Sequence, residues 1–513
     1  MIARAQPRPE TLPPQVIVSD MSKRFGSLTA LDGVSIRFES GSFHALLGEN
    51  GAGKSTLVKC MMGYYHADAG SLAVDGRVQR VANPRHARHL GLGMVYQHFT
   101  LVPSMTVAEN LVLGEDGLPA VIEWRRYRDK LEAFLATMPF RLELDRTVTS
   151  LAAGEKQKLE ILKQLYLGSR FLILDEPTSV LTPDESDELL GLMRTMADDG
   201  RISLVLITHK LREVEAHARE VSVLRHGRLA GQGLVGDLDH GELVRMMIGR
   251  ENVPAPASRN VTERTRTVLG VRELSVDNDK GLTAVAAASV RVAEGEIVGI
   301  AGVSGNGQTE FVEALAGQRR IEGGEIAVRG VRYRRTRGEM RRLRVVVLPE
   351  QPLVNGCVRS MSVAENLALR NFDRPPNTVA GWLVNRRAIR RQARVLIERF
   401  KIRTQGPEAR IETLSGGNVQ RTVLARELAE PVDVLIAQNP CFGLDLNAAA
   451  EIRNRIVNAR NAGAAVLLIS EDLDEILELA DRIVVMFEGR FVYETAREAA
   501  DVHVIGRHMA GRA

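Results

Sequence analysis

The chain has 513 residues, which is enough for at least two domains with sizeable cores. Its 68 basic and 64 acidic residues are spread along the chain, so the net charge of +4 is weak evidence for nucleic acid and would suit acidic lipid headgroups equally well. The 3 cysteines are too few for a disulfide framework or a zinc cluster, which favours a reducing compartment. No run approaches the length of a bilayer-spanning helix, and the Pro-rich first residues lack the apolar core of a signal peptide.

A glycine-rich loop follows the first strongly apolar strand. Ala45–Leu47 leads into the sequence GENGAGKS, and a helix is expected from Lys54 to about Met62. Glycines let backbone N–H groups approach phosphate oxygens closely, and a helix N-terminus adds positive potential. Lys54 would reach the outer phosphates and Ser55 would ligate Mg²⁺. A plain glycine turn before a core helix is the alternative, but the strand before the loop and the helix after it favour phosphate binding.

Two acidic residues end a later buried strand. The apolar run Phe171–Leu174 delivers Asp175 and Glu176 at its carboxyl end, where α/β sheets place ligands. Acidic residues often cap strands without a function, but downstream of a phosphate loop this pair predicts an Mg²⁺ ligand, Asp175, and a general base, Glu176. Gln97 and His209 each follow another apolar strand. His209 could bond a γ-phosphate, although a lone histidine in such a place is usually a surface residue.

The second half of the chain repeats the first in the same order. The matching segments are GENGAGKST at 48 and GVSGNGQTE at 302, TVAENL at 106 and SVAENL at 362, LAAGEKQ at 151 and LSGGNVQ at 414, FLILDEP at 171 and VLIAQNP at 434, and LVLITHKLREV at 204 and VLLISEDLDEI at 466. Collinear pairs of this kind indicate duplication. Short β-branched strands alternate with amphipathic helices in each half, which predicts largely parallel sheets.

The composition also sets the domain limits. Apolar periodicity stops in residues 251–266, where Pro, Ser and charged residues take over. We therefore expect a Pro-rich tail over 1–15, a first domain over 16–250, a linker over 251–266 and a second domain over 267–513.

Two basic stretches, residues 332–344 and 385–394, invite a nucleic-acid interpretation. Neither is interleaved with the aromatic residues that a base-stacking surface uses. Solvated faces are favoured, and contact with membrane-subunit loops or lipid headgroups is the functional alternative.

With these residues in order, and with LSGGNVQR from Leu414, the chain resembles ATP-binding cassette (ABC) ATPases over about residues 16–495. More narrowly, it resembles the tandem ATPase subunits of bacterial importers for simple sugars and nucleosides. The nucleoside branch is slightly favoured by MVYQHFTLVPSMTVAENLVLG and LDEPTSVLTPDE, whereas NPCFGLD at 439–445 departs from the usual pattern. The resemblance implies an α/β fold of two tandem P-loop NTPase domains. Each would have a mostly parallel core sheet, an antiparallel β subdomain and a helical subdomain.

The resemblance also assigns roles, with ATP and Mg²⁺ as cofactors. It implies adenine stacking on Phe25, catalysis by Glu176, His209 and Gln97, and Mg²⁺ contacts from Ser55, Gln97 and Asp175. The phosphate-loop residues of the family match Gly48, Asn50, Gly51, Gly53, Lys54, Ser55 and Thr56. The signature and the segment after it match Ser415, Gly416, Gly417, Asn418 and Asp445.

In this family two cassettes close head to tail, so each ATP lies between one phosphate loop and the opposite signature. The first composite site would combine the first-half residues above with Ser415–Gly417 and Asp445, and every chemical position is filled. The second site would be degraded throughout. Its substitutions are Gln308 for the lysine, Glu350 for the glutamine, Gln438 and Asn439 for the carboxylates, Glu471 for the histidine, Ala152, Ala153, Gly154 and Glu155 for the signature, and Thr182 for the aspartate.

The expected partners are two integral membrane permease subunits and, indirectly, an extracytoplasmic solute-binding protein, with no nucleic acid. The two cassettes would pair within one chain, peripherally on the cytoplasmic face of the bacterial inner membrane. The helical subdomains, from Gln97 to about Ser150 and from Glu350 to about Thr413, would receive coupling helices of the permeases. The alternatives are a soluble tandem-cassette ATPase acting on ribosomes or nucleic acid, and a nucleotide sensor without transport.

Overall fold

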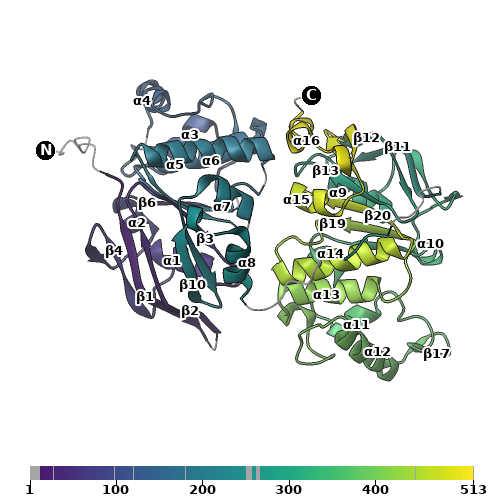
Figure 1. Ribbon diagram of the computed structural model, residues 1–513. Helices are drawn as coiled ribbons and strands as arrows, with labels where there is room; N and C mark the ends of the chain where they lie inside the picture. Colours follow the sequence, from purple (N-terminus) through teal and green to yellow (C-terminus); the bar gives the residue numbers. More distant parts are fainter. Residues whose placement is uncertain are drawn as a thin grey trace. The chain divides into compact units, whose positions relative to one another are not determined.

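The computed structural model describes residues 12–26, 28–97, 99–119, 121–179, 181–208, 210–249, 257–260, 266–444 and 446–511. The chain divides into two compact units, Met1–Glu251 and Asn252–Ala513. Each unit has its own sheets and helices and is described separately (Figure 1).

The first unit is built on a six-stranded sheet in the order β10-β9-β3-β8-β7-β6. Five of these strands run parallel and β10 pairs antiparallel with β9. The strands are β3 (Phe43–Leu47), β6 (Leu92–Val95), β7 (Phe171–Asp175), β8 (Ser203–Ile207), β9 (Glu220–Arg225) and β10 (Arg228–Leu234). The central strands β3 and β8 are buried along their whole length, as the strands of a parallel sheet that is covered on both faces are.

A second sheet of this unit is antiparallel, in the order β2-β1-β4-β5. Its strands are β1 (Val16–Phe25), β2 (Leu28–Phe38), β4 (Ala69–Val74) and β5 (Arg77–Gln79). The helices of the unit are α1 (Lys54–Met61), α2 (Pro84–His89), α3 (Val107–Val112), α4 (Trp124–Ala136), α5 (Ala153–Tyr166), α6 (Pro183–Asp198), α7 (Leu211–His217) and α8 (His240–Ile248). Figure 1 shows α3, α4 and α5 grouped at one end of the unit and β1, β2 and β4 at the other.

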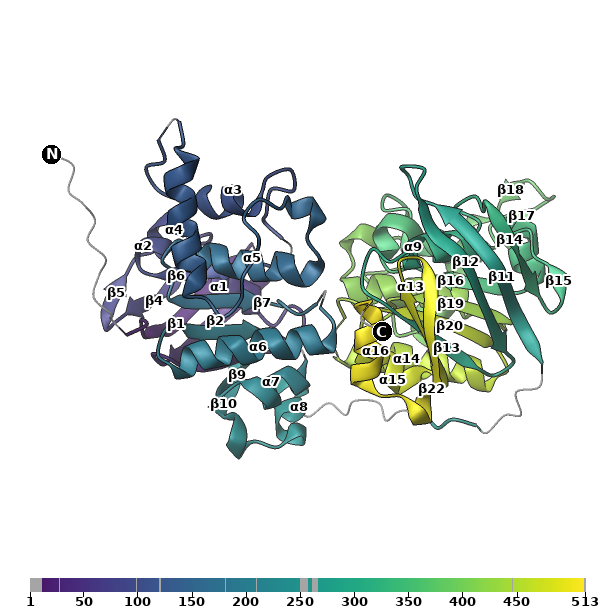
Figure 2. The same ribbon diagram turned by 90° about the horizontal axis from the view of Figure 1, so that it is seen from above.

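The second unit has the same plan. Its six-stranded sheet, β16-β19-β20-β13-β21-β22, matches the first strand for strand, and its antiparallel sheet is β12-β11-β14-β15 (Figure 2). The strands are β11 (Thr267–Asp277), β12 (Thr283–Ala293), β13 (Ile297–Ala301), β14 (Gly323–Val328), β15 (Val331–Arg332), β16 (Val345–Leu348), β19 (Val434–Gln438), β20 (Ala465–Ser470), β21 (Arg482–Phe487) and β22 (Arg490–Ala496).

The helices of the second unit follow the same sequence of elements. They are α9 (Gln308–Leu315), α10 (Arg337–Arg342), α11 (Val363–Ala368), α12 (Arg386–Arg399), α13 (Gly416–Glu427), α14 (Leu446–Asn461), α15 (Leu473–Leu479) and α16 (Val502–Met509). The unit adds a two-stranded hairpin, β17 (Thr378–Val379) with β18 (Leu383–Val384), just before α12.

The structure therefore confirms the duplicated α/β architecture expected from the sequence. Each unit has a mostly parallel core sheet, an antiparallel sheet and a helical segment inserted after the strand that ends near Gln97 or Glu350. Across the described part of the chain, no helix has both the length and the apolar character needed to cross a membrane.

Candidate functional site

The glycine loop of the first unit links the buried strand β3 to α1. Gly53 is the N-cap of α1 and has φ 107°, a left-handed conformation that glycine adopts without strain. A Cβ atom on Gly53 would lie 2.7 Å from the backbone oxygen of Ala30, and one on Gly48 would overlap the backbone oxygen of Leu224. Glycine is therefore required at both positions by close packing as well as by backbone conformation.

Lys54 is held inside this loop. Its Nζ donates to the backbone oxygens of Gly48 (2.6 Å) and Glu49 (3.1 Å), and the residue is only 7% exposed. Burial lowers the pKa of Lys54, and the nearby carboxylates of Glu176 and Asp175 act in the opposite direction. The ammonium group is thus already positioned beside the loop backbone and within the field of the acidic pair.

Asp175 and Glu176 lie where the sequence predicts, at the carboxyl end of β7. Burial, followed by repulsion from Glu176, raises the pKa of Asp175 to about 6. Glu176 has φ 48° and its backbone N–H donates to Ile207 in β8 at 2.9 Å. A left-handed backbone conformation is unfavourable for glutamate, and the hydrogen bond to the neighbouring strand holds Glu176 in it.

Gln97 belongs to the same group. It follows β6, and its Nε2 donates to Glu176 Oε2 at 3.0 Å. Strand ends β6 and β7 and the loop after β3 therefore bring Gln97, Glu176 and Lys54 to one edge of the sheet. The oxygens of Ser55, Gln97 and Asp175 are hard ligands of the kind that Mg²⁺ prefers alongside phosphate oxygens and water, so the residue types fit that ion.

Phe25 and His209 complete the first-unit prediction. Phe25 ends β1, is 41% exposed and packs edge-on against Tyr65 with ring centroids 5.2 Å apart, which leaves ring surface in solvent. His209 lies outside the described residues.

A buried cluster beside these residues was not predicted from the sequence. Glu213 accepts hydrogen bonds from the hydroxyls of Thr178 (2.5 Å) and Thr208 (3.0 Å), and Lys210 Nζ lies 3.5 Å from its carboxylate. We call Thr178, Thr208 and Glu213 the strand-end clamp, because they join the segments that follow β7 and β8. The sequence signal was present, since threonine follows Glu176-Pro177 and a glutamate opens the helix after His209.

The corresponding loop of the second unit keeps the backbone and loses the charge. Gly307 caps α9 with φ 98°, much as Gly53 caps α1. Gln308 is 7% exposed, like Lys54, and its Nε2 donates to the backbone oxygen of Val303 at 3.1 Å. A neutral amide therefore occupies the place of the ammonium group.

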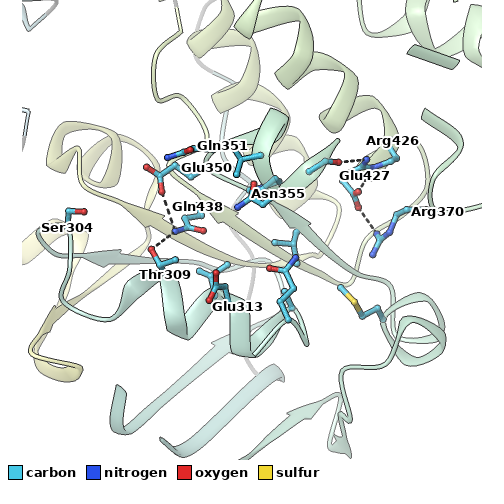
Figure 3. Close-up of a pocket in the computed structure, with 18 residues that line it drawn as sticks. Ser304, Thr309, Glu313, Glu350, Gln351, Asn355, Arg370, Arg426, Glu427 and Gln438 are labelled. Carbon is cyan, nitrogen blue, oxygen red and sulfur yellow. Dashed lines mark hydrogen bonds and ion pairs between the residues drawn. The ribbon is translucent and has the colours of Figure 1, made fainter. Parts of the chain in front are cut away.

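The strand ends of the second unit are bonded to one another. Gln438 Nε2 donates to Thr309 Oγ1 (3.2 Å) and Glu350 Oε2 (3.5 Å), as Figure 3 shows. Asn439 has φ 40° and accepts the backbone N–H of Glu471 at 2.9 Å. Burial, followed by repulsion from Glu350, raises the pKa of Glu471 to about 7. Two carboxyl groups and no lysine make this edge unfavourable for a triphosphate.

A cavity of about 510 Å³ extends from this edge along α9 to α13 (Figure 3). Thr309 and Gln438 line one end. At the other, Glu427 pairs with Arg426 (2.7 Å) and Arg370 (2.6 Å), and Arg426 also donates to the backbone oxygen of Gly356 at 2.7 Å. The cavity therefore connects the altered strand ends with the helical segment of the second unit.

The two signature helices differ at their N-termini. Ser415 caps α13 and is exposed, and its hydroxyl accepts from Asn418 Nδ2 at 2.8 Å. Gly416 is also exposed, and a Cβ on it would meet nothing within 4 Å. The start of α13 thus presents a hydroxyl and backbone N–H groups outward, as an anion site requires. Gly417 is partly buried, and Asp445 lies outside the described residues.

In the first unit, a side-chain carboxylate occupies the equivalent helix start. Glu155 Oε2 accepts the backbone N–H of Ala152 at 2.9 Å and Arg146 Nη1 bonds Glu155 Oε1 at 2.6 Å. Burial raises the pKa of Glu155, but these two partners outweigh it and the net shift is downward. A second carboxylate, that of Glu185, would lie 2.9 Å from a Cβ on Gly154. The start of α5 is therefore neutralised from within and repels a further anion.

Comparison with known proteins agrees with these features. A family model described as ABC transporter matches residues 31–179 and 285–441. The nucleoside import ATP-binding protein NupA of Lactococcus lactis subsp. cremoris is 37% identical over 96% of this chain and 97% of its own length. The glucose import ATP-binding protein TsgD13 of Haloferax volcanii is 38% identical over 98% of this chain and 96% of its own length. The guanosine import ATP-binding protein NupO of Bacillus subtilis is 35% identical over 96% of each chain.

A solved structure has the same two-unit fold. It is that of the complex of archaeal ribosomal stalk protein aP1 and archaeal ribosome recycling factor aABCE1, in which the matched chain is 19% identical, with a TM-score of 0.61 over 96% of this chain and 92% of that one. At that identity the likeness shows the fold alone. The matched family segments in both halves, and the relatives that align over nearly the whole chain, establish that the protein belongs to the ABC transporter family, as an ATP-hydrolysing subunit with two cassettes.

Proposed function

We propose that the protein hydrolyses ATP at one composite site and thereby drives uptake of a nucleoside or simple sugar through two separate permease subunits. The observation that carries the proposal is the distribution of intact parts. The competent loop and carboxylates lie in the first unit, whereas the exposed serine-capped signature helix lies in the second. If substitutions had accumulated in the second unit alone, the first unit would have the signature segment that matches the family pattern more closely.

Each residue of the proposed site has a defined task. Lys54 and the loop N–H groups would hold the outer phosphates, and Phe25 would stack on the adenine. Mg²⁺, held by Ser55, Gln97 and Asp175, would neutralise charge that develops on the phosphate oxygens. Glu176 would accept a proton from the attacking water, so that the γ-phosphate leaves ADP as inorganic phosphate.

The helix start of α13 would complete the site from the second unit. Ser415, Gly416 and Gly417 would donate to the γ-phosphate, with Asn418 holding the Ser415 hydroxyl and Asp445 lying nearby. His209 would add a further donor to that phosphate. ATP binding would close the two cassettes and hydrolysis would release them.

The same comparisons support the proposed partners. Relatives that align over nearly the whole chain are named for import of nucleosides, glucose and guanosine, which supports a membrane transporter over action on ribosomes or nucleic acid. We place the protein peripherally on the cytoplasmic face of the bacterial inner membrane, with an extracytoplasmic binding protein supplying the solute. In the second unit, the cavity between α9 and α13 is a suitable place for a permease loop to dock.

A matched pair of substitutions tests the composite site. Ser415→Arg places a bulky side chain at the start of α13 and is expected to abolish ATP turnover, although Ser415 is in the other unit from Lys54. Ala152→Arg makes the same change at the equivalent position of α5 and should leave turnover unchanged. Phosphate release by the full chain measures both. Normal turnover in Ser415→Arg, or equal loss in the two variants, would overturn the proposal.

A further inference from the structure

The helical segment of the second unit carries an exposed apolar tip. In the β17–β18 hairpin, Trp382 is 79% exposed and Leu383 and Val379 are 54% and 52% exposed. The turn between the strands passes through Ala380 (φ 54°) and Gly381 (φ 77°). Large apolar side chains that project from a two-stranded hairpin gain nothing from the core of their own unit, and a group of them indicates a contact surface.

The base of the hairpin is firmly held. Thr378 Oγ1 donates across it to the backbone oxygen of Leu383 at 3.1 Å. Asn385, the N-cap of α12, donates through its backbone to Asn377 (2.7 Å) and through its side chain to Pro376 (3.2 Å). The buried Asn377 in turn bonds Asn371 Oδ1 at 2.9 Å. The tip is therefore presented by a fixed base that is continuous with the start of α12.

Arginines cover the exposed face of α12. Arg386, Arg387, Arg390, Arg391 and Arg394 are all exposed and, at about 100° per residue, fall within roughly 140° of the helix circumference. The opposite face, with Ala388, Ile389 and Ala393, is buried.

Little of this charge is neutralised locally. Arg390 lies 2.5 Å from Glu408, and Glu398 is the one acidic residue of α12. Within the described residues, Arg387, Arg391 and Arg394 form no ion pair. A dense positive face therefore begins within a few residues of the exposed tryptophan.

The equivalent helix of the first unit lacks this character. In α4, Asp129 and Glu132 alternate with the basic residues, Arg128 pairs with Asp145 at 2.9 Å, and Lys130 pairs with Glu115. The positive face is thus particular to the second unit and is not a general feature of the helical segments.

We propose that the hairpin tip and the arginine face of α12 together contact the anionic lipid headgroups of the membrane. Tryptophan prefers the level of the headgroups, and basic residues on an amphipathic helix are attracted to acidic lipids, each contributing about fivefold to partitioning (about 1 kcal/mol). RNA fits less well, because the tip supplies one aromatic ring rather than a series of stacking surfaces.

This inference refines the membrane location given under the proposed function but does not depend on the composite site. Contact with headgroups by the second unit would keep the ATPase at the membrane surface when the permeases are absent.

Trp382 provides a direct measurement. The chain has 2 tryptophans, so Trp124→Phe leaves Trp382 as the sole reporter. The full chain in this background would be mixed with vesicles of phosphatidylcholine alone or of phosphatidylcholine with phosphatidylglycerol, without nucleotide. We expect a blue shift of the Trp382 fluorescence, and its quenching by brominated acyl chains, only with phosphatidylglycerol. Both should be reversed by 1 M salt, at which the Debye length is about 3 Å.

Charge variants test the arginine face. Arg387→Glu with Arg391→Glu and Arg394→Glu should weaken vesicle binding at least tenfold, whereas a control with two charge reversals on α4, Arg125→Glu with Arg126→Glu, should change it less than twofold. If the triple variant unfolds early in a thermal melt, Arg391→Gln with Arg394→Gln replaces it and should weaken binding several-fold. Trp382→Ser should reduce sedimentation with the anionic vesicles.

Several results would overturn the inference. These are equal binding to neutral and anionic vesicles, no shift with either, equal weakening by the α4 control, or charge-dependent binding to single-stranded RNA without vesicle binding. Ser415→Arg should bind vesicles normally, so loss of the composite site and loss of the lipid surface are distinguishable.

Discussion

Glu176 is the residue whose chemistry is most sharply defined by its surroundings. Its backbone is fixed by Ile207 in β8, and Gln97 donates to its carboxylate at 3.0 Å. Glu176→Gln keeps the shape and removes the base, so ATP turnover should fall by roughly 10²–10⁴-fold while ATP stays bound. Phosphate release and retained nucleotide measure the two effects.

The second unit offers the matched control. Asn439 occupies the equivalent strand end with a similar backbone, φ 40° against 48°. Asn439→Asp keeps the acceptor for Glu471 and supplies a carboxylate, yet turnover should not change, because the lysine and the opposite signature are still missing. Near-normal turnover in Glu176→Gln would contradict the assignment of the base.

Glu471 should make the stability of the second unit depend on pH. Its pKa is raised from 4.5 to about 7, chiefly by burial, so the folded chain holds this proton more tightly than the unfolded chain. The contribution of Glu471 to stability is therefore most favourable below about pH 4.5 and is lost as pH rises to about 7. The loss is on the order of 3 kcal/mol.

Glu471→Gln should remove that pH dependence. We expect the variant to be more stable than the parent at pH 8 and nearly equal at pH 4, as measured by denaturant unfolding at each pH. Glu398→Gln, an exposed change on α12, is the control and should alter neither value. Equal gains at both pH values would show that burial of the Glu471 charge is not the cause.

The second unit has a counterpart of the strand-end clamp, formed by Cys441, Ser470 and Glu475, in which a thiol replaces one of the two hydroxyl groups. In the first unit both oxygens of Glu213 accept threonine hydroxyls. In the second, Ser470 donates to Glu475 Oε2 at 2.7 Å, but Cys441 stands where Thr178 does. Glu475 Oε1 has no hydrogen-bond partner among the described residues and lies 3.9 Å from Arg453 Nε. A thiol is a weak donor, so this clamp is incomplete.

Cys441→Thr should therefore stabilise the second unit. A hydroxyl donor to a buried carboxylate contributes about 1 kcal/mol or more, and Thr178 shows that the methyl group fits the equivalent place. The midpoint of denaturant unfolding measures the gain. Cys357→Thr, which changes a half-buried thiol elsewhere in the unit, should be neutral or destabilising. A gain from both substitutions, or from neither, would contradict the explanation.

The sequence predicted an element wherever residues with a chemical role lie next to a regular apolar pattern. The loop before Lys54 and the acidic end of β7 follow from local patterns, and the repeat predicted a duplicated unit, which the equal sheet orders confirm. The clamp was missed although its residues could be read from the sequence, because Thr178 and Glu213 look ordinary until the fold places them side by side. The carboxylate at the start of α5 was missed for a related reason. Glu155 counts as a lost signature residue in sequence, whereas the structure shows it capping the helix.

Across the whole molecule, the duplicated units differ in which of these elements each preserves. The first has a charged loop and a self-neutralised signature helix, and the second has an uncharged loop and an open signature helix. If the two units share sites, restoring one unit alone cannot restore the second site. Restoring one unit alone therefore distinguishes two cassettes that share their sites from two cassettes that work independently.

The prediction is made in a Glu176→Gln background, where the first site is silent. The first set of changes restores the second unit: Gln308→Lys, Glu350→Gln, Gln438→Asp, Asn439→Glu and Glu471→His. The second set restores the first-unit signature: Ala152→Ser, Ala153→Gly, Glu155→Gln and Thr182→Asp. The first set alone should regain nucleotide binding, because the lysine returns and attracts the phosphates, while the number of carboxyl groups at this edge stays the same, with two removed and two introduced.

Turnover should return only when both sets are combined, because the γ-phosphate needs donors from the opposite helix start. Photo-crosslinking of labelled ATP measures binding, phosphate release measures turnover, and thermal unfolding checks that each chain folds. Turnover from the first set alone would show that the second unit works by itself. If the combined chain is folded and binds nucleotide but shows no ATP turnover, the loss of function at the second site involves more than these nine positions.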